Sequence, residues 1–455
     1  MKHNTTANRH SLVAWRFQAV FGIILSFFMV SESFAVGASG FSTQLVGAKA
    51  LGQGNAFAGE ADDPSALYFN PAGITQLKGT QLSVGGAAIV PFTDRTNATD
   101  VNGAAVPDDH MKRELSIIPN FYLTQSAPWG NDKVSIGVGL TSPYGITTEW
   151  APTSSVRYIT TTSKFEMVNV NPSVAYKVTP ELSLGAGADY VNLYNTVAQN
   201  QINQSFDNAP DGTTKLSGHG SGWGYNVGAL YKPVEKHSFG LGYRSQVRIP
   251  IKGSVELSNL STTFQSIFGG ANYSATATSS VILPASILAG YAFKPTEKWT
   301  LLADYEWTQW NVFQSQSVAV NETDPTRRAV LTGDPSSNVT TQPRNWHNVS
   351  AFGVGANFKQ NDAWQWRGGY AYFQKTVPND TFSPDVPDAT NHLLTAGFSW
   401  SWESIILDFA FNAYIYPSRS VNNTVGNNVG ASVNGTYKTF APAIALNLTY
   451  KFSKG

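Results

Sequence analysis

The sequence lacks cysteine altogether, and only 13% of its 455 residues are charged. Without Cys there is no disulfide framework and no cysteine-bound metal site, which suits an oxidising compartment where stray thiols are a liability. A soluble domain usually carries about 25% charged residues, so part of this surface faces something other than water. The formal net charge is zero, which argues against a nucleic-acid partner, because such partners need clustered Lys and Arg.

The N-terminus has the features of a secretory signal peptide. Three basic residues precede the apolar run "AVFGIILSFFMV" at 19–30, and small residues follow at Ser33 and Ala35. The apolar core is shorter than the ~20 residues of a membrane-spanning helix. We expect residues 1–35 to be removed, with cleavage after Ala38 as the alternative.

Long apolar runs are also missing from the rest of the chain, and strand patterns take their place. No later run approaches the ~18 apolar residues of a spanning helix, which excludes a helical membrane protein. In "WTLLADYEWTQW" (299–310), Leu301 and Tyr305 fall on one face and Asp304 on the other, the two-residue period of a strand with one apolar side. We count fourteen such segments between residues 80 and 452, and most have ten residues or more.

The connections between these segments alternate in length. Short polar turns such as "KPVEKHS" and "KPTEKWT" alternate with long segments rich in Ser, Thr, Asn and Gly. The long segments are 203–218, 258–277, 318–343 and 375–390. Short turns at one rim, long loops at the other and an apolar outer face are typical of an outer-membrane β-barrel. Tryptophans near strand ends fit the aromatic girdles of such barrels: Trp299, Trp310, Trp364, Trp366, Trp400 and Trp402.

A barrel of fourteen strands is wide enough to leak, so its lumen must be filled. Residues 36–79 are the sizeable stretch that the wall does not need, and they are rich in Gly and Ala. We therefore predict an all-β protein: a fourteen-stranded antiparallel transmembrane barrel at 80–455 with an N-terminal plug at 36–79. The turn Asn70-Pro71-Ala72-Gly73 fixes the exit of the plug into the first strand, because Pro sets one backbone angle and Asn bonds its own backbone.

Several motifs together resemble the FadL family of outer-membrane transporters for long-chain fatty acids and other hydrophobic compounds. They are "SGFSTQLVGAKALGQGNAFAGEADDPSALYFNPAGI", "LTSPYGITTEW", "GYRSQVRIPIKG", "ADYEWTQWNVF", "NWHNVSAFGVGANF" and the aromatic C-terminal strand. The resemblance runs in order from about residue 39 to 452. It implies a fourteen-stranded barrel in the outer membrane of a Gram-negative bacterium, an N-terminal hatch, and passive transport without energy coupling.

The resemblance also implies a side exit, because this family releases substrate through a gap in the wall where one strand is kinked. Pro143 stands inside a strand pattern, where it cannot donate a ladder hydrogen bond, and Gly145 weakens pairing further. We expect Ser142-Pro143-Tyr144-Gly145 to be the gate, with Asn70 and its turn packed against the interruption. The alternative is a bulge that shapes the barrel, since bulges are common at barrel rims.

Substrate-binding residues follow from the resemblance less directly. Fatty-acid members hold the carboxylate with cationic side chains, whereas the corresponding positions here are His347, beside Trp346, and Gln199. A neutral His and a Gln hold an anion less firmly than two fixed charges. Arg244 is a further lumen cation. It takes the place of the family's cationic side chains unless it forms an ion pair with an acidic residue of the inner wall.

Other functional classes leave no trace in the motifs. The seven His show no metal-binding spacing such as H-E-x-x-H, and "GHGSGWG" lacks the spacing of a nucleophile elbow. We expect no enzyme activity, no catalytic or metal-ligating residues and no cofactor. The expected partners are a hydrophobic small molecule and outer-membrane lipid. We expect the protein to be a monomer. An outer-membrane lipid-modifying enzyme and a general porin remain alternatives.

Overall fold

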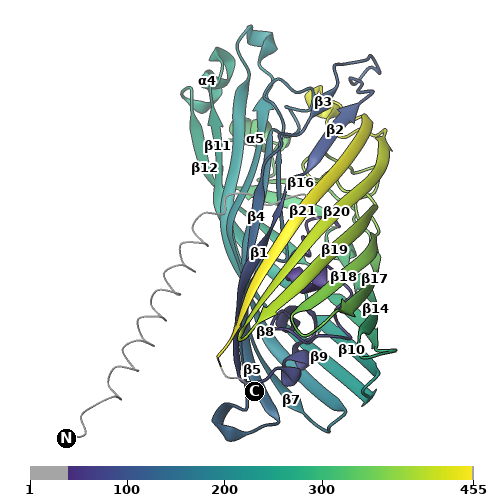
Figure 1. The fold of residues 1–455 in the computed structure, drawn as a ribbon. Helices are drawn as coiled ribbons and strands as arrows, with labels where there is room; N and C mark the ends of the chain where they lie inside the picture. The colour runs from purple at the N-terminus through teal and green to yellow at the C-terminus, as the bar shows by residue number, and fades with distance from the viewer. Residues whose placement is uncertain (1–38, 453–455) are drawn as a thin grey trace, which may run out of the picture. The chain divides into compact units, whose positions relative to one another are not determined.

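The structure, a computed structural model, describes residues 39–452, and strands make up most of them (Figure 1). The strands are β1 (Thr80–Ile89), β2 (Phe92–Thr96), β3 (Asp109–His110), β4 (Ser116–Ser126), β5 (Val134–Thr141), β6 (Gly145–Glu149), β7 (Thr162–Lys177), β8 (Leu182–Ile202), β9 (Gly212–Val234), β10 (His237–Arg244), β11 (Val247–Ser258), β12 (Tyr273–Leu283), β13 (Ser286–Phe293), β14 (Trp299–Thr308), β15 (Ser315–Val320), β16 (Val339–Pro343), β17 (Val349–Lys359), β18 (Trp364–Phe373), β19 (Asn391–Trp402), β20 (Ile405–Val421) and β21 (Gly435–Lys451). The helices are α2 (Ala48–Leu51), α3 (Ala66–Phe69), α4 (Thr262–Phe268) and α5 (Pro325–Thr332), with single 3₁₀ turns at η1 (Pro71–Gln76), η2 (Pro128–Gly130), η3 (Ser205–Asp207), η4 (Trp310–Val312) and η5 (Asn427–Val429). None of the helices within residues 39–452 is both long enough and apolar enough to cross a membrane.

The strands form one closed antiparallel barrel. When the halves of bent strands are joined, each strand pairs with the next along the chain, and β21 returns to pair with β1, from Gln81 opposite Lys451 to Ile89 opposite Ala443. Bends divide several strands in two, as between β10 and β11, which both pair with β9. With such halves joined, the described residues form fourteen barrel strands, which confirms the predicted fold.

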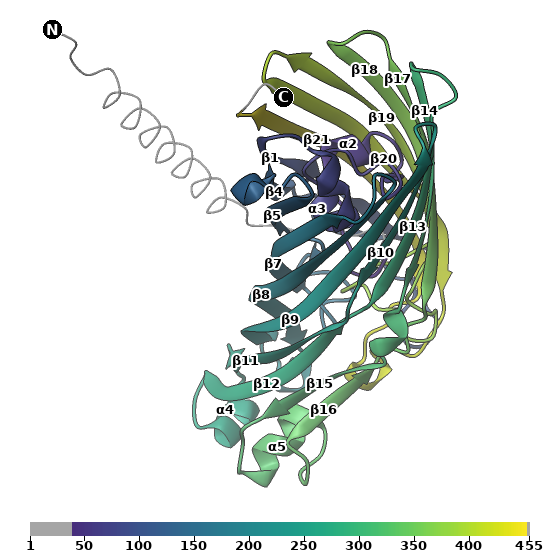
Figure 2. The same ribbon diagram turned by 90° about the horizontal axis from the view of Figure 1, so that it is seen from below.

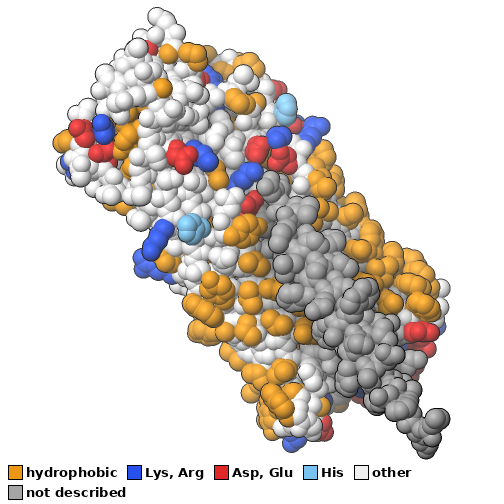
Figure 3. Space-filling view, turned by 90° about the vertical axis from the view of Figure 1, so that its left-hand side faces the viewer, with side chains coloured by type: hydrophobic (Ala, Val, Ile, Leu, Met, Phe, Trp, Pro, Cys, Tyr) orange, Lys and Arg blue, Asp and Glu red, His pale blue; other side chains and the backbone are white. Residues whose placement is uncertain are grey.

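The wall has an apolar outer face and a polar inner face. In β21 the side chains of Ile444, Leu446 and Leu448 are about half exposed. Asn447 and Thr449, which alternate with them along the strand, are buried. Figure 3 shows apolar side chains spread along the barrel wall, with most charged ones gathered toward one end. The two-residue period of the sequence therefore places hydrocarbon outside and hydrogen-bonding groups inside, as a membrane barrel requires.

Short and long connections alternate along the chain, and the barrel strands of one rim extend far beyond the membrane. β9 has 23 residues, or about 75 Å at about 3.3 Å per residue, whereas about 9 to 11 residues span a membrane. Three predicted long loops are therefore too long: 203–218 gives way to β9 at Gly212, 258–277 gives way to β12 at Tyr273, and 318–343 contains β16. This projecting end carries α4 and α5 (Figure 1).

Aromatic side chains gather at the rim with the short turns. Trp366 and Trp402 are about half exposed, and each stacks on a neighbouring Trp of its own strand, Trp364 and Trp400. Trp310 does not join them. It is fully buried inside the barrel, so its assignment to the girdle was wrong: the two-residue period breaks in the 3₁₀ turn η4, which turns its ring inward.

Residues 39–79 lie inside the ring of strands, as Figure 2 shows for α2 and α3. Nearly all of them are buried, and their backbone bonds to the wall. The carboxylate of Asp304 accepts hydrogen bonds from the backbone N–H groups of Phe57 and Ala58, both at 2.8 Å. β1 follows directly at Thr80. The predicted signal peptide, residues 1–35, lies outside the described residues.

The Asn70 turn is clamped against strands β8 and β9. The Asn70 side-chain amide donates to the backbone carbonyl of Ala58 at 3.1 Å and to that of Ala229 at 2.9 Å, and its oxygen accepts from Ala72 N–H at 3.2 Å. This close approach needs glycine in the wall, since a Cβ on Gly228 would lie 2.2 Å from the Asn70 side-chain oxygen.

We predict that Gly228→Ala loosens this turn from the wall, because the added methyl group overlaps Asn70 and Pro71. The chain has no Cys, so Ala72→Cys, at a fully buried position, gives a single labelling site. Maleimide labelling of Ala72→Cys should be slow alone and about 5- to 150-fold faster with Gly228→Ala, as expected for a loss of about 1 to 3 kcal/mol.

The matched control is Gly368→Ala, where the nearest atom to the new Cβ lies 3.8 Å away. It should leave labelling unchanged. Equal labelling rates in all three proteins would show that the turn is not held by this contact.

Candidate functional site

The barrel wall is interrupted at the segment that links β5 to β6. β5 pairs with β4 as far as Leu140 opposite Phe121, and β6 pairs with β7 from Gly145 onward. Among the described residues, β6 has no pairing with β4, and Ser116–Asn120 of β4 pairs with β1 alone. The break thus falls at the predicted Ser142-Pro143-Tyr144-Gly145, where Pro143 has no N–H to donate.

A short N-terminal arm, Ser39–Thr43, pairs with this break from inside the barrel. Thr43 N–H donates to the Pro143 carbonyl at 2.9 Å, and Gly145 N–H donates to the Phe41 carbonyl at 2.7 Å. The Thr43 hydroxyl donates to the Ser142 carbonyl at 2.8 Å. The arm therefore supplies the hydrogen-bond partners that the bent strand loses from β4, as buried backbone groups require.

The expected contact between the Asn70 turn and Pro143 was wrong. Asn70 bonds Ala58 and Ala229, on the β9 side of the barrel, and Pro143 is met by Thr43 instead. The physical reason is hydrogen-bond geometry: an extended arm offers alternating N–H and C=O groups that match a strand, whereas the turn uses its amide to close on itself.

The arm is fixed at its other side by Asp388, in the loop between β18 and β19. The Asp388 carboxylate accepts from Gly40 N–H at 3.2 Å, and from the N–H groups of Thr376 and Val377 at 2.7 and 3.0 Å. Burial raises the pKa of this carboxyl above its ordinary value, whereas the three N–H donors and the nearby Arg419 guanidinium favour its charged form.

Phe41 of the arm is the centre of an aromatic cluster. Its ring centroid lies 4.8 Å from that of Trp310, 5.0 Å from Trp346, 5.5 Å from Phe313 and 5.1 Å from Phe165. Trp310 and Trp346 are fully buried. Such edge-to-face and tilted contacts add about 0.5 to 1.5 kcal/mol each to the burial of the rings, so the cluster is a strong packing contact of the arm.

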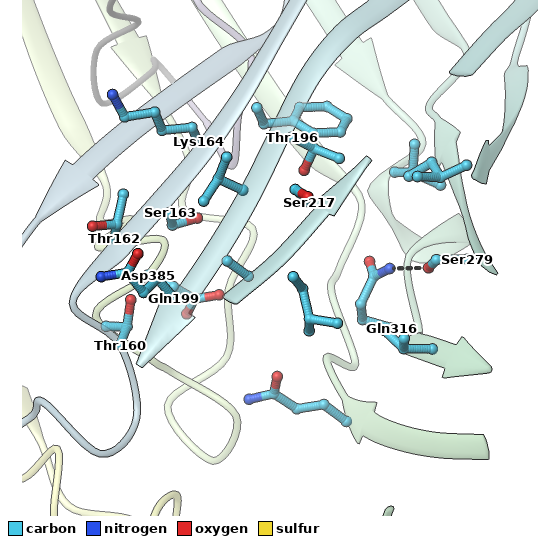
Figure 4. Close-up of a pocket in the computed structure, with 18 of the residues that line it drawn as sticks. Thr160, Thr162, Ser163, Lys164, Thr196, Gln199, Ser217, Ser279, Gln316 and Asp385 are labelled. Carbon is cyan, nitrogen blue, oxygen red and sulfur yellow. Dashed lines mark hydrogen bonds between the residues drawn. The ribbon is translucent and has the colours of Figure 1, made fainter. Parts of the chain in front are cut away.

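Above this cluster lies a cavity of about 320 Å³. Its walls come from β6, β7, β8, β9, β11, β12 and β15. Arg344 and the loop after β18 close one side. The apolar lining consists of Phe41, Ile146, Ile159, Phe165, Val197, Leu216, Ile251, Val281, Phe313, Val318 and Val386. Figure 4 shows the polar lining, with Thr160, Thr162, Gln199 and Asp385 gathered on one side. A mostly apolar cavity with a few polar groups suits a small amphiphilic or apolar ligand.

A second, smaller cavity of about 130 Å³ adjoins the first at the projecting rim. Side chains of α4 and α5, such as Phe264, Phe268 and Leu331, line it with residues of β9, β11 and β15. Leu216, Val318 and Thr340 line both cavities. The two spaces are therefore neighbours along one apolar route from the loops to the lumen.

The four predicted substrate-binding residues do not lie together. Gln199 lines the large cavity. Trp346 does not line the cavity. It packs against Phe41 and Phe313, and these two side chains do line the cavity. His347 is exposed and absent from the lining, so its head-group role was wrong: in an extended segment the neighbour of an inward Trp346 points outward.

Arg244 is also away from the large cavity. It is buried, pairs with the carboxylate of Asp189, and donates to the Tyr68 carbonyl at 3.1 Å. It lines a separate space of about 40 Å³ together with Gln44 and Glu306. These contacts fix the segment inside the barrel to the wall, and a part for Arg244 in substrate binding stays a prediction.

Sequence reasoning missed the charged residues of the cavity. Lys164, Arg344 and Asp385 line it, but they stand on β7, before β17 and in the loop after β18, with no local motif to join them. Phe41 was missed as well, although its neighbour Gly40 carries a signal: φ is +58° there, and a Cβ would lie 2.7 Å from Trp346.

Comparison with known proteins adds a family to this geometry. The model of the outer membrane protein transport protein family (OMPP1/FadL/TodX) matches residues 29–452. The chain belongs to this family. It is therefore an outer-membrane transporter of hydrophobic compounds in a Gram-negative bacterium, and not an enzyme.

Individual relatives cover most of the chain. A putative outer membrane protein of Neisseria meningitidis serogroup B is 25% identical, over 92% of this chain and 96% of the relative. The long-chain fatty acid transport protein of Escherichia coli K12 is 26% identical, over 77% and 82%. Among solved structures, a Pseudomonas aeruginosa FadL homologue superposes with a TM-score of 0.78 at 20% identity, covering 91% of this chain and all of the homologue. A Ralstonia pickettii toluene transporter gives 0.65 at 17%, covering 90% and 99%. These structural likenesses support the fold.

The geometry predicts different effects for two of the residues. Gln199→Ala should weaken binding of a ligand with a polar head by about 2- to 10-fold, the effect of one lost hydrogen bond of about 0.5 to 1.5 kcal/mol. His347→Ala should leave binding unchanged, because its side chain lies outside the lining.

Both variants are measured by displacement of a fluorescent apolar probe from the purified barrel. A loss of affinity in His347→Ala with none in Gln199→Ala would contradict this placement of the two side chains.

Proposed function

We propose that this transporter takes up hydrophobic compounds through the loop end of the barrel and releases them sideways into the membrane at the break between β5 and β6. The compound enters the small cavity under α4 and α5, moves into the large cavity, and leaves past the N-terminal arm. No energy source is needed, because the free energy of an apolar compound falls when it passes from water to apolar surroundings.

The observation that carries this proposal is the double role of Phe41. Its ring lines the large cavity, and its carbonyl accepts the hydrogen bond from Gly145 at the break. A displacement of the arm therefore opens the floor of the cavity and uncovers the gap in the wall at once. With the arm in place, both are closed.

The segment 39–79 completes the mechanism as a plug. It fills the ring of strands with buried side chains, and Asp304, Arg244 and the Asn70 turn tie it to the wall. A general porin needs an open water channel, so this filling favours a carrier of apolar compounds. The cavity and the break belong to a single closed barrel, which supports function as a monomer in outer-membrane lipid.

Deletion of residues 39–79 should convert the barrel into an ion-conducting pore, because this almost wholly buried segment fills the ring of strands around α2 and α3. Conductance in planar lipid bilayers should rise from near zero to that of an open barrel, with Gly368→Ala as a full-length control. Low conductance in a correctly folded deletion variant would show that the segment does not block the lumen.

The side exit is tested by repairing the break. Pro143→Val restores an N–H donor and Gly145→Ala stiffens the backbone, so together they favour continuous pairing of this barrel strand with β4. Uptake of a labelled hydrophobic compound by cells should fall about tenfold, as for a barrier raised by about 1.4 kcal/mol, with ligand affinity of the purified protein unchanged.

Pro172→Val is the control for that experiment. Pro172 is exposed on β7 and pairs in regular register with Val138, so its replacement should leave uptake intact. Wild-type uptake by the repaired barrel would mean that the compound leaves through the lumen toward the periplasm.

A further inference from the structure

The charged side chains that line the large cavity are all held in ion pairs. Arg344 and Asp385 form a bidentate ion pair, with Nη1–Oδ1 and Nη2–Oδ2 distances of 3.3 and 2.8 Å. Lys164 lies 3.6 Å from a carboxylate oxygen of Glu149. Within the described chain, Lys164, Arg344 and Asp385 are the charged residues of the lining, and Glu149 is not part of it.

The surroundings of Lys164 are balanced as well. Glu149 also pairs with Lys112 at 3.1 Å, and Lys112 pairs with Glu114. Two cations thus face two carboxylates. A carboxylate entering the cavity meets no unpaired cation there, and it meets the negative charge of Asp385 at the polar side of the cavity (Figure 4).

Neutral hydrogen-bonding groups in the same lining are free. Within residues 39–452, the hydroxyls of Thr160, Thr162 and Thr196 and the side-chain amide of Gln199 make no hydrogen bond to the protein. They lie on the same side as Asp385 or on the neighbouring strands β7 and β8 (Figure 4). Groups of this kind donate to and accept from a neutral head group without a change in charge.

From this contrast we propose that the cavity selects amphiphiles with a neutral polar head, such as alcohols, amides or esters, over carboxylate anions. The proposal rests on the proposed function, since it names the class of compound that the same cavity carries. An anion entering here loses its hydration without gaining a counter-charge, which disfavours it. A neutral head loses less hydration and finds free partners.

The Arg344–Asp385 pair is the element that determines this selectivity. Burial opposes the charge on Asp385, but the charge and hydrogen bonds of Arg344, with smaller contributions from Ser383 and a backbone N–H, together hold the pKa of that carboxyl below its ordinary value. Above the ordinary pKa range of a carboxyl group, Arg344 therefore has an ionised partner. Removal of the Asp385 charge frees a buried guanidinium, which prefers a carboxylate as its partner.

The test compares 1-decanol with decanoate, which share a chain length, by displacement of a bound fluorescent probe at about pH 8, where a carboxyl group is ionised. In the wild-type protein we expect decanol to bind at least about tenfold more tightly. Asp385→Asn should raise decanoate affinity by about tenfold or more and leave decanol nearly unchanged. Asp380→Asn, in the same loop but exposed, should change neither.

Two further measurements keep the test decisive if Asp385→Asn folds poorly. The double variant Arg344→Gln with Asp385→Asn has no charge in this pair and should keep the preference for decanol. In the wild type, a change from pH 8 to about pH 4 protonates much of the decanoate and should bring its affinity toward that of decanol, because the lowered pKa of Asp385 favours its charged form.

Tighter binding of decanoate than decanol by the wild type, or an unchanged ratio in a folded Asp385→Asn variant, overturns the proposed selectivity. Those results leave hydrophobic transport intact if either compound is taken up by cells. If neither compound binds or is taken up, the proposed function itself fails, and the selectivity with it.

Discussion

Every backbone N–H and C=O group in this wall must find a partner inside the protein, because the hydrocarbon of a membrane offers none. Closure of β21 onto β1 meets this constraint for the barrel as a whole. At Ser142–Gly145 the wall does not meet it, since Pro143 has no donor and β4 lies out of reach. The structure resolves the conflict by bringing the arm, Ser39–Thr43, into contact with the break as a short substitute strand.

This substitution ties three features to one segment. The arm completes the hydrogen bonding of the break, closes the floor of the large cavity with Phe41, and is itself fixed by Asp388 in a loop of the far wall. This contact combines hydrogen bonds of the arm with one aromatic cluster, and its parts are separate from the barrel ladder. In the proposed mechanism the arm therefore moves without unfolding the wall.

Charge inside the barrel serves structure at almost every point. Arg244 pairs with Asp189 of the wall and donates to the Tyr68 carbonyl of the plug. Asp304 accepts hydrogen bonds from the backbone N–H groups of Phe57 and Ala58. Arg344 pairs with Asp385. Each buried charge has its partner, because an unpaired one costs several kcal/mol. The consequence for transport is a cavity whose free polar groups are neutral.

Much of the fold follows from local patterns. The two-residue alternation of Ile444, Leu446 and Leu448 against Asn447 gives the faces of the wall, and Pro143 within a strand pattern marks the break. The same logic failed where the chain leaves regular strands. Trp310 was placed on the outer girdle, but a 3₁₀ turn directs it inward, and the strands beside 203–218 extend farther than their polar composition indicates.

The sequence by itself determined that this chain forms an outer-membrane barrel with an interrupted barrel strand, because periodicity and the position of a proline are properties of neighbouring residues. Only the tertiary structure decided what meets the interruption and what lines the cavity. Phe41 lies about a hundred residues from Gly145, and Arg344 lies 41 residues from Asp385, so the ring of strands, and no local rule, brings them together. The contact of Thr43 rather than Asn70 with Pro143, and the absence of His347 from the cavity that Gln199 lines, follow from that same long-range register.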